Sequence, residues 1–331
     1  MSANSRIRCQ ALHSKIMSAT EASALIRPGS NVGMSGFTGS GYPKAVPLAL
    51  AKRIMDANLA GQKFKIGVWT GASTAPELDA ALAMVDGIEL RLPYQSDPVC
   101  RKKINAGEME YIDLHLSHVA QFVRQGFLGK LDVALVEVTA IREDGSLVPS
   151  SSVGNNATWI EAADHVILEV NSWQNEKLEG MHDIYMDQDV PHRVPIPIVH
   201  AADRIGSPYI PCPPDKVLAI VETNAPDRNT PFSPPDEASK RIAGHILDFL
   251  THEVKKGRVP ENLLPLQSGV GNIANAVLNG LNDGPFENLT SYTEGIQDGM
   301  VSLMKSGKLR VASATAFSLS PEAMDDVNRN L

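Results

Sequence analysis

The chain has 331 residues, of which 43% are hydrophobic and 21% are charged. This length exceeds one ordinary hydrophobic core and predicts two domains. The 30 Lys and Arg residues against 38 Asp and Glu give a net charge of −8, which argues against a nucleic-acid partner or an anionic membrane surface but leaves room for an anionic small molecule in a locally positive site.

The first twenty residues contain Arg6, Arg8 and Lys15 and no acid before Glu21. A mitochondrial transit peptide has this composition, and so has an ordinary N-terminal helix. No apolar run reaches the roughly 18 residues that span a bilayer. We expect a cytoplasmic protein, with the mitochondrial matrix as the alternative.

Short β-rich runs then alternate with helical patterns up to residue 223. The helical patterns include Pro43–Ile54 and Leu114–Phe127, the latter with an apolar stripe expected to face a core. Such alternation predicts βαβ units, and hence an open, mostly parallel α/β sheet in an N-terminal domain, residues 1–223. The expected strands are Asn31–Ser35, Phe64–Trp69, Ile88–Pro93, Val133–Val138, His165–Val170 and Val217–Val221.

The composition changes at residues 224–237, "NAPDRNTPFSPPDE", which we interpret as a linker because Pro, Asn and Asp dominate it. Within it, Ser233 followed by Pro234 predicts the start of a helix, with Ser as the N-cap and Pro at the first position. That helix is expected to end at Gly257.

A second α/β domain, residues 238–331, contains an expected strand at Leu309–Ala312. Ser320 and Pro321 then predict another helix start, whose apolar face reaches Leu331, the last residue. Since an amphipathic helix is an unusual place for a domain to stop, we expect this second domain to be incomplete in the chain.

One carboxylate in this domain stands in a neutral stretch, "NLTSYTEGIQDGM" at 288–300. Glu294 lies between a β-like run, Leu289–Thr293, and a helical one, Ile296–Met304. A carboxylate that acts as a nucleophile must stay ionised, which few acidic neighbours favour. A surface Glu at a strand end explains the same residues equally well.

The preceding stretch, "LQSGVGNIANAV", supports two interpretations. Gly269, Gly271 and Ala274 satisfy G-x-G-x-x-A, and Glu294 follows Ala274 by twenty residues, as in a dinucleotide-binding fold. Pro265 and Gln267, however, interrupt the strand that such a fold requires. In the alternative, the glycines let an acyl substrate approach the backbone, and N–H groups at the start of the following helix stabilise an oxyanion.

The whole chain resembles the acetyl-CoA hydrolase/transferase family, the class I CoA-transferases. Within that family, the resemblance is greatest to bacterial enzymes that exchange CoA between succinyl-CoA and acetate. It rests on "LQSGVGNIANAV", "YTEGIQDGM", "SGFTGSGYPKAVP" (35–47), "TGAST" (70–74), "INAGEMEYIDLHLSH" (104–118), "VPSSSVGN" (148–155), "EVNSWQN" (169–175) and "FSLSPEA" (317–323).

The resemblance implies a fold of two open α/β domains and a covalent mechanism in which Glu294 is the nucleophile. An acyl-glutamyl anhydride would form first and a glutamyl-CoA thioester second. CoA is then a substrate, and neither ATP, a metal nor a permanently bound cofactor is needed. Acyl-CoA and small carboxylates are the expected partners, in a homodimer.

The resemblance also assigns binding residues. The segment Leu266, Gln267, Ser268, Gly269 and Val270 is expected to contact CoA, with the Val270 N–H as one oxyanion donor. Arg228 matches the position that faces the substrate carboxylate, a task suited to a guanidinium fork. Ser73 and Ser96 match positions near the acyl group.

Two features differ from the family pattern. Gly295 follows the nucleophile where relatives usually have an aliphatic residue, which suggests a looser backbone there. Relatives also continue beyond residue 331, where a second oxyanion donor is expected, and loss of one such donor costs on the order of 10²–10³ in rate. Hydrolysis of acetyl-CoA and a catalytically incomplete homologue therefore remain alternatives to CoA transfer.

The remaining motifs give weaker indications of function. In "GFTGSGYPK" Lys44 follows Pro43, so it is not a P-loop, and we expect a loop at the C-terminal edge of the first sheet. His115 and His118 lack a second ligand cluster, and a hydrogen-bonded or solvated pair is favoured over a metal site. Cys9, Cys100 and Cys212 form no CxxC pattern, which predicts inert thiols in a reducing compartment.

Overall fold

The computed structural model describes residues 3–229 and 235–330. The chain divides into two compact units: unit 1 is Met1–Val194 with Gly206–Arg228, and unit 2 is Pro195–Ile205 with Asn229–Leu331. The division at Arg228 falls within the expected linker, whereas no sequence pattern indicated that residues 195–205 group with unit 2. The domain boundaries at 223 and 238 stay a prediction.

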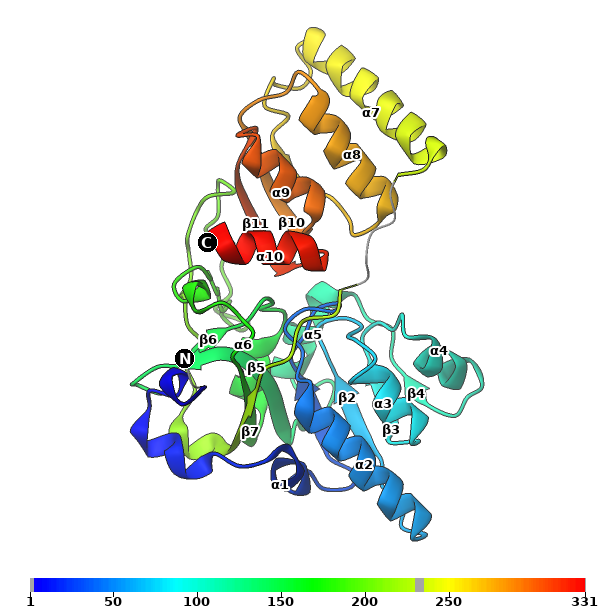
Figure 1. Ribbon diagram of the computed structural model, residues 1–331, viewed down its shortest axis with the longest axis vertical. Helices are drawn as coiled ribbons and strands as arrows, with labels where there is room; N and C mark the ends of the chain where they lie inside the picture. The colour runs from blue at the N-terminus through cyan, green and yellow to red at the C-terminus, as the bar shows by residue number, and fades with distance from the viewer. Residues whose placement is uncertain (1–2, 230–234, 331) are drawn as a thin grey trace. The chain divides into compact units, whose positions relative to one another are not determined.

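Unit 1 is built on one twisted sheet in the order β4-β3-β2-β1-β5-β7-β8, with β6 pairing with β5 (Figure 1). Every pairing is parallel except that of β5 with β6. The strands are β1 Asn31–Met34, β2 Ile66–Trp69, β3 Ile88–Leu92, β4 Glu110–Tyr111, β5 Val133–Ile141, β6 Leu147–Pro149, β7 His165–Asn171 and β8 Val217–Thr223.

Helices cover both faces of this sheet, so its central strands are buried on both sides. Along β5, Val133 and Leu135 pack into one cluster and Ala134 and Val136 into the other, as period-2 alternation requires. The cluster that includes Val133 and Leu135 also contains side chains from α1 Ala19–Ala24, α2 Ala45–Leu59, α3 Asp79–Met84 and α4 Pro98–Asn105. The cluster that includes Ala134 and Val136 contains side chains from α5 Leu116–Arg124 and α6 Asn156–Ala162.

The six expected strands of unit 1 are confirmed, as are helices within Pro43–Ile54 and Leu114–Phe127, where α5 buries Val119 and Val123. Short 3-10 helices complete the unit: η1 Ala3–Arg6, η2 Gln10–Lys15, η3 Glu176–Leu178 and η4 Pro214–Lys216. Arg6 donates hydrogen bonds to the carbonyl oxygens of Asn171, Ser172 and Gln174. The N-terminal segment is thus an integral part of unit 1.

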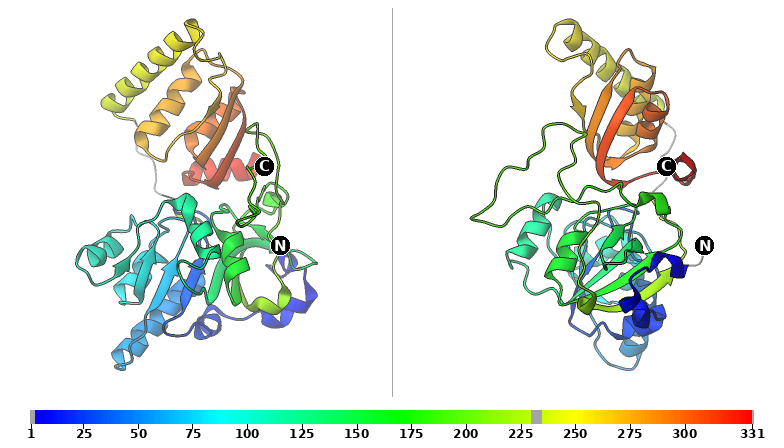
Figure 2. Two further views of the ribbon diagram at one scale, coloured as in Figure 1. Left: turned by 180° about the vertical axis from the view of Figure 1, so that it is seen from behind. Right: turned by 90° about the vertical axis from the view of Figure 1, so that its left-hand side faces the viewer.

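Unit 2 contains a three-stranded parallel sheet in the order β11-β10-β9 (Figure 2). Its core consists mainly of apolar side chains from α8, α9 and the sheet, and Figures 1 and 2 show both helices along one sheet face. The elements are α7 Glu237–Lys255, β9 Pro265–Leu266, α8 Asn272–Asp283, β10 Leu289–Ile296, α9 Asp298–Lys305, β11 Leu309–Phe317 and α10 Pro321–Asn330.

Two expectations for this unit are wrong and three are confirmed. Helix α7 ends just before Gly257, and β11 contains the expected strand Leu309–Ala312. The helix after the linker begins at Glu237, and its N-cap is Asp236, whose carboxylate accepts from the Ser239 N–H; Ser233 and Pro234 lie outside the described residues. Strand β10 continues through Ile296, so Glu294 lies in the strand and not between strand and helix. Ser320 does cap α10, accepting from the Ala323 N–H at 3.2 Å.

Candidate active site

Glu294 lies near the carboxyl end of β10, on the sheet face that is less covered. Burial alternates along the strand: Leu289, Ser291 and Thr293 are buried, while Tyr292 is exposed and Glu294 half-buried. Among the described residues, the Glu294 carboxylate has no hydrogen-bond or ion-pair partner. The carboxylate is therefore accessible and not engaged by its own fold, as a nucleophile has to be.

The loop between β9 and α8 is fastened to the strand that carries Glu294. The Ser268 N–H donates to Thr293 Oγ1 at 3.1 Å, and the Thr293 hydroxyl donates to the Ser268 carbonyl at 2.9 Å. One residue further back, Ser291 Oγ donates to the Leu266 carbonyl at 3.0 Å. The residue immediately before Glu294 thus fixes the expected CoA-contacting segment.

A second attachment comes from Gln297, whose side chain is fully buried. Its Nε2 donates to the Gly269 carbonyl at 2.8 Å, and its Oε1 accepts from the Gly271 N–H at 3.4 Å. Gly271 has φ 156° and ψ 167°, a conformation essentially restricted to glycine. The loop turns there into α8, which begins at Asn272.

Val270 occupies the exposed tip of this loop. The residue is 44% exposed, and within the described part of the chain its backbone N–H has no acceptor. A Cβ added to Gly295 would lie 3.5 Å from Val270 Cγ2, so the tip lies beside the residue that follows Glu294. An unpaired N–H on a loop beside the strand, just before the start of a helix, is a group of the kind that can stabilise an oxyanion.

The structure explains why a glycine is suited to position 295. It pairs in register with Ala316 of β11, and a Cβ there would lie 3.0 Å from Ser318 Oγ. The residue is buried within a regular parallel ladder. The expected looser backbone at this position is therefore not what the strand geometry indicates.

Arg228 belongs to unit 1, and its side chain is 62% exposed. Its Nη1 lies 2.7 Å from Glu77 Oε1, and its backbone N–H donates to the Gly39 carbonyl at 2.9 Å. The guanidinium thus already holds one carboxylate, in a loop region at the carboxyl end of β1.

Ser73 and Ser96 are brought together: the Ser96 N–H donates to Ser73 Oγ at 3.1 Å. Ser96 is exposed, but Ser73 is buried and its hydroxyl donates to Gln95 Oε1 at 2.6 Å. Asp79, in a buried pair with Arg91 at 3.0 Å, accepts from the Thr74 N–H and shapes this loop. The Ser73 hydroxyl is therefore occupied within its own fold.

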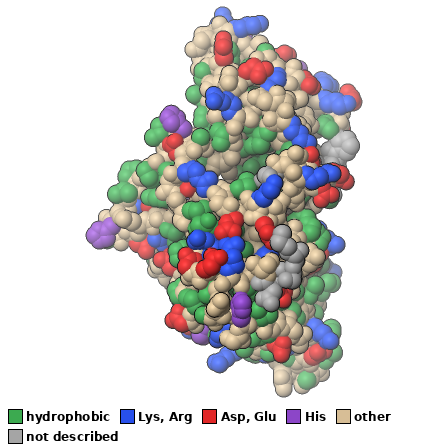
Figure 3. Space-filling model, turned by 60° about the vertical axis from the view of Figure 1, so that its left-hand side comes forward, with side chains coloured by type: hydrophobic (Ala, Val, Ile, Leu, Met, Phe, Trp, Pro, Cys, Tyr) green, Lys and Arg blue, Asp and Glu red, His purple; other side chains and the backbone are tan. Residues whose placement is uncertain are grey.

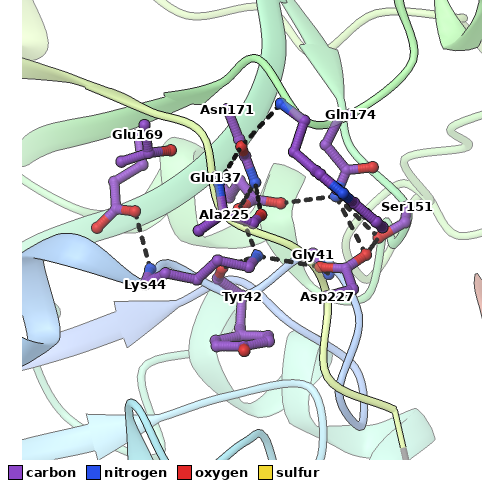
Figure 4. A network of polar contacts seen from close by, with 12 residues as sticks. Gly41, Tyr42, Lys44, Glu137, Ser151, Glu169, Asn171, Gln174, Ala225 and Asp227 are labelled. Atoms are coloured by element: carbon purple, nitrogen blue, oxygen red, sulfur yellow. Dashed lines mark hydrogen bonds and ion pairs between the residues drawn. The ribbon is translucent and has the colours of Figure 1, made fainter. Parts of the chain in front are cut away.

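A buried polar network lies beneath the loops at the carboxyl edge of the unit 1 sheet (Figure 4). Lys44 Nζ is 2.6 Å from Glu137 and 3.0 Å from Asp227, and these two carboxylates are 0% and 3% exposed. Gln174 donates to both carboxylates, and Asn171 donates to Glu137. Lys44 lies where the sequence predicted a sheet-edge loop, and its role there is structural.

The charges in this network respond to burial and to one another. Burial raises the pKa of Glu137 to about 7, and the nearby Lys44 opposes that rise. Burial alone would lower the pKa of Lys44, but its two carboxylate partners raise it overall. A neighbouring carboxylate, Glu169, accepts from the N–H groups of Lys44, Ala45 and Val46 at the start of α2, and burial raises its pKa.

Sequence reasoning missed Glu137, Glu169 and Asp227. The first two stand in otherwise apolar strands, "VALVEV" and "HVILEV", and a lone acid in such a strand signals a buried partner. Asp227 gave no comparable signal, because its partners lie far away in the sequence.

The described residues contain neither a group of three or more His, Cys, Asp and Glu able to hold a metal ion nor a helix long and apolar enough to cross a membrane. His115 and His118 make an edge-to-face ring contact with centroids 5.3 Å apart. On the face shown in Figure 3, basic and acidic side chains are interspersed. Cys9, Cys100 and Cys212 are buried, and burial raises the pKa of the Cys100 and Cys212 thiols.

Comparison with curated proteins shows close relatives. A succinyl-CoA:acetate CoA-transferase of Clostridium kluyveri is 45% identical over 98% of this chain and 60% of its own. An acetyl-CoA hydrolase of Saccharomyces cerevisiae is 43% identical, and a propanoyl-CoA:succinate CoA transferase of Escherichia coli 38%, over 97% and 95% of this chain and 62% and 64% of theirs. The chain thus spans less than two thirds of these relatives' lengths.

Solved structures agree on the fold. RipA from Yersinia pestis matches 99% of this chain and 66% of its own with a TM-score of 0.70 at 19% identity. A 4-hydroxybutyrate CoA-transferase from Porphyromonas gingivalis matches 96% of this chain and 66% of its own with a TM-score of 0.59 at 19% identity. The family model described as the acetyl-CoA hydrolase/transferase N-terminal domain matches residues 1–222. The chain therefore belongs to the acetyl-CoA hydrolase/transferase family.

Proposed function

We propose that this protein transfers CoA from an acyl-CoA to a free carboxylate, with Glu294 as the nucleophile and succinyl-CoA and acetate as substrates. The observation that carries the proposal is that two groups of this region, the Glu294 carboxylate and a backbone N–H on the adjacent loop, are both without a partner in the part of the chain that the structure describes. Glu294 has no partner among the described residues, and neither has the Val270 N–H.

The first half-reaction has two steps. The Glu294 carboxylate attacks the acyl-CoA carbonyl carbon, forming a C–O bond as the C–S bond breaks, which gives an acyl-glutamyl anhydride and CoA thiolate. The thiolate then attacks the glutamyl carbonyl, and the first acid leaves as its carboxylate. The product is a glutamyl-CoA thioester, so the thioester bond is conserved.

The second half-reaction reverses these steps with a different acid. Acetate attacks the glutamyl thioester and CoA thiolate leaves, which forms an acetyl-glutamyl anhydride. The thiolate then attacks the acetyl carbonyl, yielding acetyl-CoA and restoring the Glu294 carboxylate. Every step moves a negative charge onto a carbonyl oxygen, where the Val270 N–H would stabilise it.

The loop and Arg228 supply binding in this proposal. Residues Leu266–Val270 would contact CoA, as the family resemblance implies, and Ser291, Thr293 and Gln297 hold this segment against the Glu294 strand. Arg228 would bind a substrate carboxylate, such as the distal carboxylate of succinate, through its planar fork. Ser73 and Ser96 would contribute through the shape of their loops, since the Ser73 hydroxyl is already engaged.

Hydrolysis of acetyl-CoA is the second candidate, and the relatives supply its observation: the yeast relative named an acetyl-CoA hydrolase is about as similar as the transferase from Clostridium kluyveri. The two reactions differ only in whether water or a carboxylate opens the thioester. Loss of acetyl-CoA that depends on added succinate indicates transfer, and loss that does not indicates hydrolysis.

The covalent step is tested by intact mass after mixing the chain with acetyl-CoA. Transfer of CoA to Glu294 releases acetate and adds one CoA less one water. Glu294→Ala should show no adduct, while Glu287→Ala, which removes a mostly exposed carboxylate from the same region, should form it normally. An adduct that persists in Glu294→Ala rejects Glu294 as the nucleophile.

We further propose a homodimer in the cytoplasm, as the family resemblance and the cysteine pattern favour. Molar mass from light scattering coupled to gel filtration tests the assembly. A mass corresponding to one chain across the micromolar range would reject the dimer.

A further inference from the structure

The Arg228 guanidinium is only partly engaged by Glu77. Nη1 lies 2.7 Å from Glu77 Oε1, and among the described residues the other two guanidinium nitrogens have no partner. A second carboxylate therefore finds free donors, but it must either displace Glu77 from Nη1 or bind beside a like charge.

Glu77 is oriented from its other oxygen. The Tyr42 hydroxyl donates to Glu77 Oε2 at 3.2 Å, and Tyr42 is 1% exposed. The Tyr42 ring lies 4.1 Å from Lys44 Nζ, within the network of Figure 4. Because a rigid residue holds one oxygen, the other oxygen is presented to Arg228 in a fixed direction.

The backbone of Arg228 is fixed by the same network. The preceding residue, Asp227, accepts from Lys44 Nζ and from the Gly41 N–H, each at 3.0 Å, and from the Ser151 hydroxyl. The Arg228 N–H is bonded to Gly39. Only the Arg228 side chain, 62% exposed against 24% for Glu77, is left to move between carboxylate partners.

We propose that Glu77 is a specificity-determining residue: an internal carboxylate that occupies Arg228 when no substrate carboxylate is bound and that competes with the incoming acid. This inference rests on the proposed role of Arg228. It predicts that Glu77 weakens binding of dicarboxylates more than of acetate, because a dicarboxylate keeps a second anionic group to place on Arg228.

The size of the effect follows from the exposure of the pair. Partly exposed ion pairs contribute little, and removing the competitor should tighten succinate binding by about two- to fivefold. Tyr42→Phe keeps the Glu77 carboxylate but removes the hydrogen bond that orients it, so its effect should be in the same direction and smaller.

Labelling with phenylglyoxal, followed by peptide mass spectrometry, reads the state of Arg228 without requiring turnover. The reagent attacks the unprotonated guanidine, which an ion pair disfavours, so Glu77→Gln should label faster at Arg228 than wild type. Succinate, titrated at constant ionic strength, should protect Arg228 in both proteins, with half-protection in Glu77→Gln at a concentration about two to five times lower.

The chain provides a matched control. Arg258 pairs with Glu253 at 2.5 Å in unit 2. Glu253→Gln should accelerate labelling of Arg258, yet succinate should protect Arg258 in neither protein. Circular dichroism checks that each variant is folded, and if Glu77→Gln is not, the shift in Tyr42→Phe decides.

Equal half-protection in wild type and Glu77→Gln overturns the competition. Weaker protection in Glu77→Gln also overturns it, because Glu77 would then position Arg228 for the substrate. If succinate protects Arg228 in neither protein, the proposed carboxylate role of Arg228 fails and the inference with it. The adduct on Glu294 reports separately on the proposed reaction.

Discussion

Replacing Lys44 with Met should destabilise unit 1 strongly and in a pH-dependent way. Met keeps most of the length of the side chain but removes the cation that Glu137 and Asp227 share at 2.6 and 3.0 Å. Both carboxylates are almost completely buried, and water cannot replace the ammonium group.

The expected loss at pH 7.5 is about 3–5 kcal/mol of unfolding free energy, the usual cost of removing one partner of a buried pair. Protonation of Glu137 limits this loss of unfolding free energy. The pKa of Glu137 is already raised from 4.5 to about 7 by burial, and without Lys44 it rises further. Folded Glu137 then holds a proton that the unfolded carboxyl releases above pH 4.5, so stability falls as pH rises. The cost of Lys44→Met should accordingly be smaller at pH 5.5 than at pH 7.5.

Urea unfolding followed by tryptophan fluorescence isolates this effect, because all three tryptophans, Trp69, Trp159 and Trp173, belong to unit 1. Lys130→Met is a matched control, since Lys130 is 65% exposed and its loss should leave the unfolding free energy nearly unchanged. A loss below about 1 kcal/mol for Lys44→Met, unchanged between pH 5.5 and 7.5, would refute the view that this lysine compensates buried charge.

Three further changes probe other parts of the fold. Thr293→Val removes both hydrogen bonds to Ser268, should cost about 1–3 kcal/mol, and should slow CoA adduct formation measured by intact mass; an unchanged rate would separate the loop from the chemistry. Asp236→Ala removes the N-cap of α7 and should lower the midpoint of thermal unfolding, whereas Asp236→Asn, which keeps a capping side chain, should leave it nearly unchanged. Cys100 and Cys212 should react with iodoacetamide only after urea unfolding; rapid labelling of the folded chain would contradict their burial.

The sequence predicted the main strands of unit 1 because each combines apolar residues, in short runs or in alternation, with clear ends. Strands β4, β6 and β9 escaped prediction, since two or three residues carry no periodicity. The extent of β10 was underestimated because Glu294 and Gly295 are poor strand formers, and pairing with β11 overrides that preference.

The sequence predicted which residues belong to the candidate site but not how they contact one another. Glu294 and Val270 were named from a resemblance, but nothing in the sequence indicated that Thr293 and Gln297 fasten the loop. The pairing of Arg228 with Glu77 joins residues 151 positions apart, and neither has a pattern around it. Such contacts follow from the topology, because the loops that follow parallel strands lie at the same edge of the sheet, even though β2 and β8 are not adjacent in it.

The alternation of β10 couples the two halves of the proposed chemistry. Thr293 and Glu294 point to opposite faces of the sheet, so Thr293 can bond to Ser268 while Glu294 stays unengaged. Gln297, which follows the end of the strand, holds the same loop from its other end. Displacing the loop therefore requires breaking its hydrogen bonds to Thr293 and Gln297, on either side of Glu294. If Val270 and Glu294 act as we propose, this attachment holds the oxyanion donor at a fixed place relative to the nucleophile, which is the condition under which such a donor is most effective.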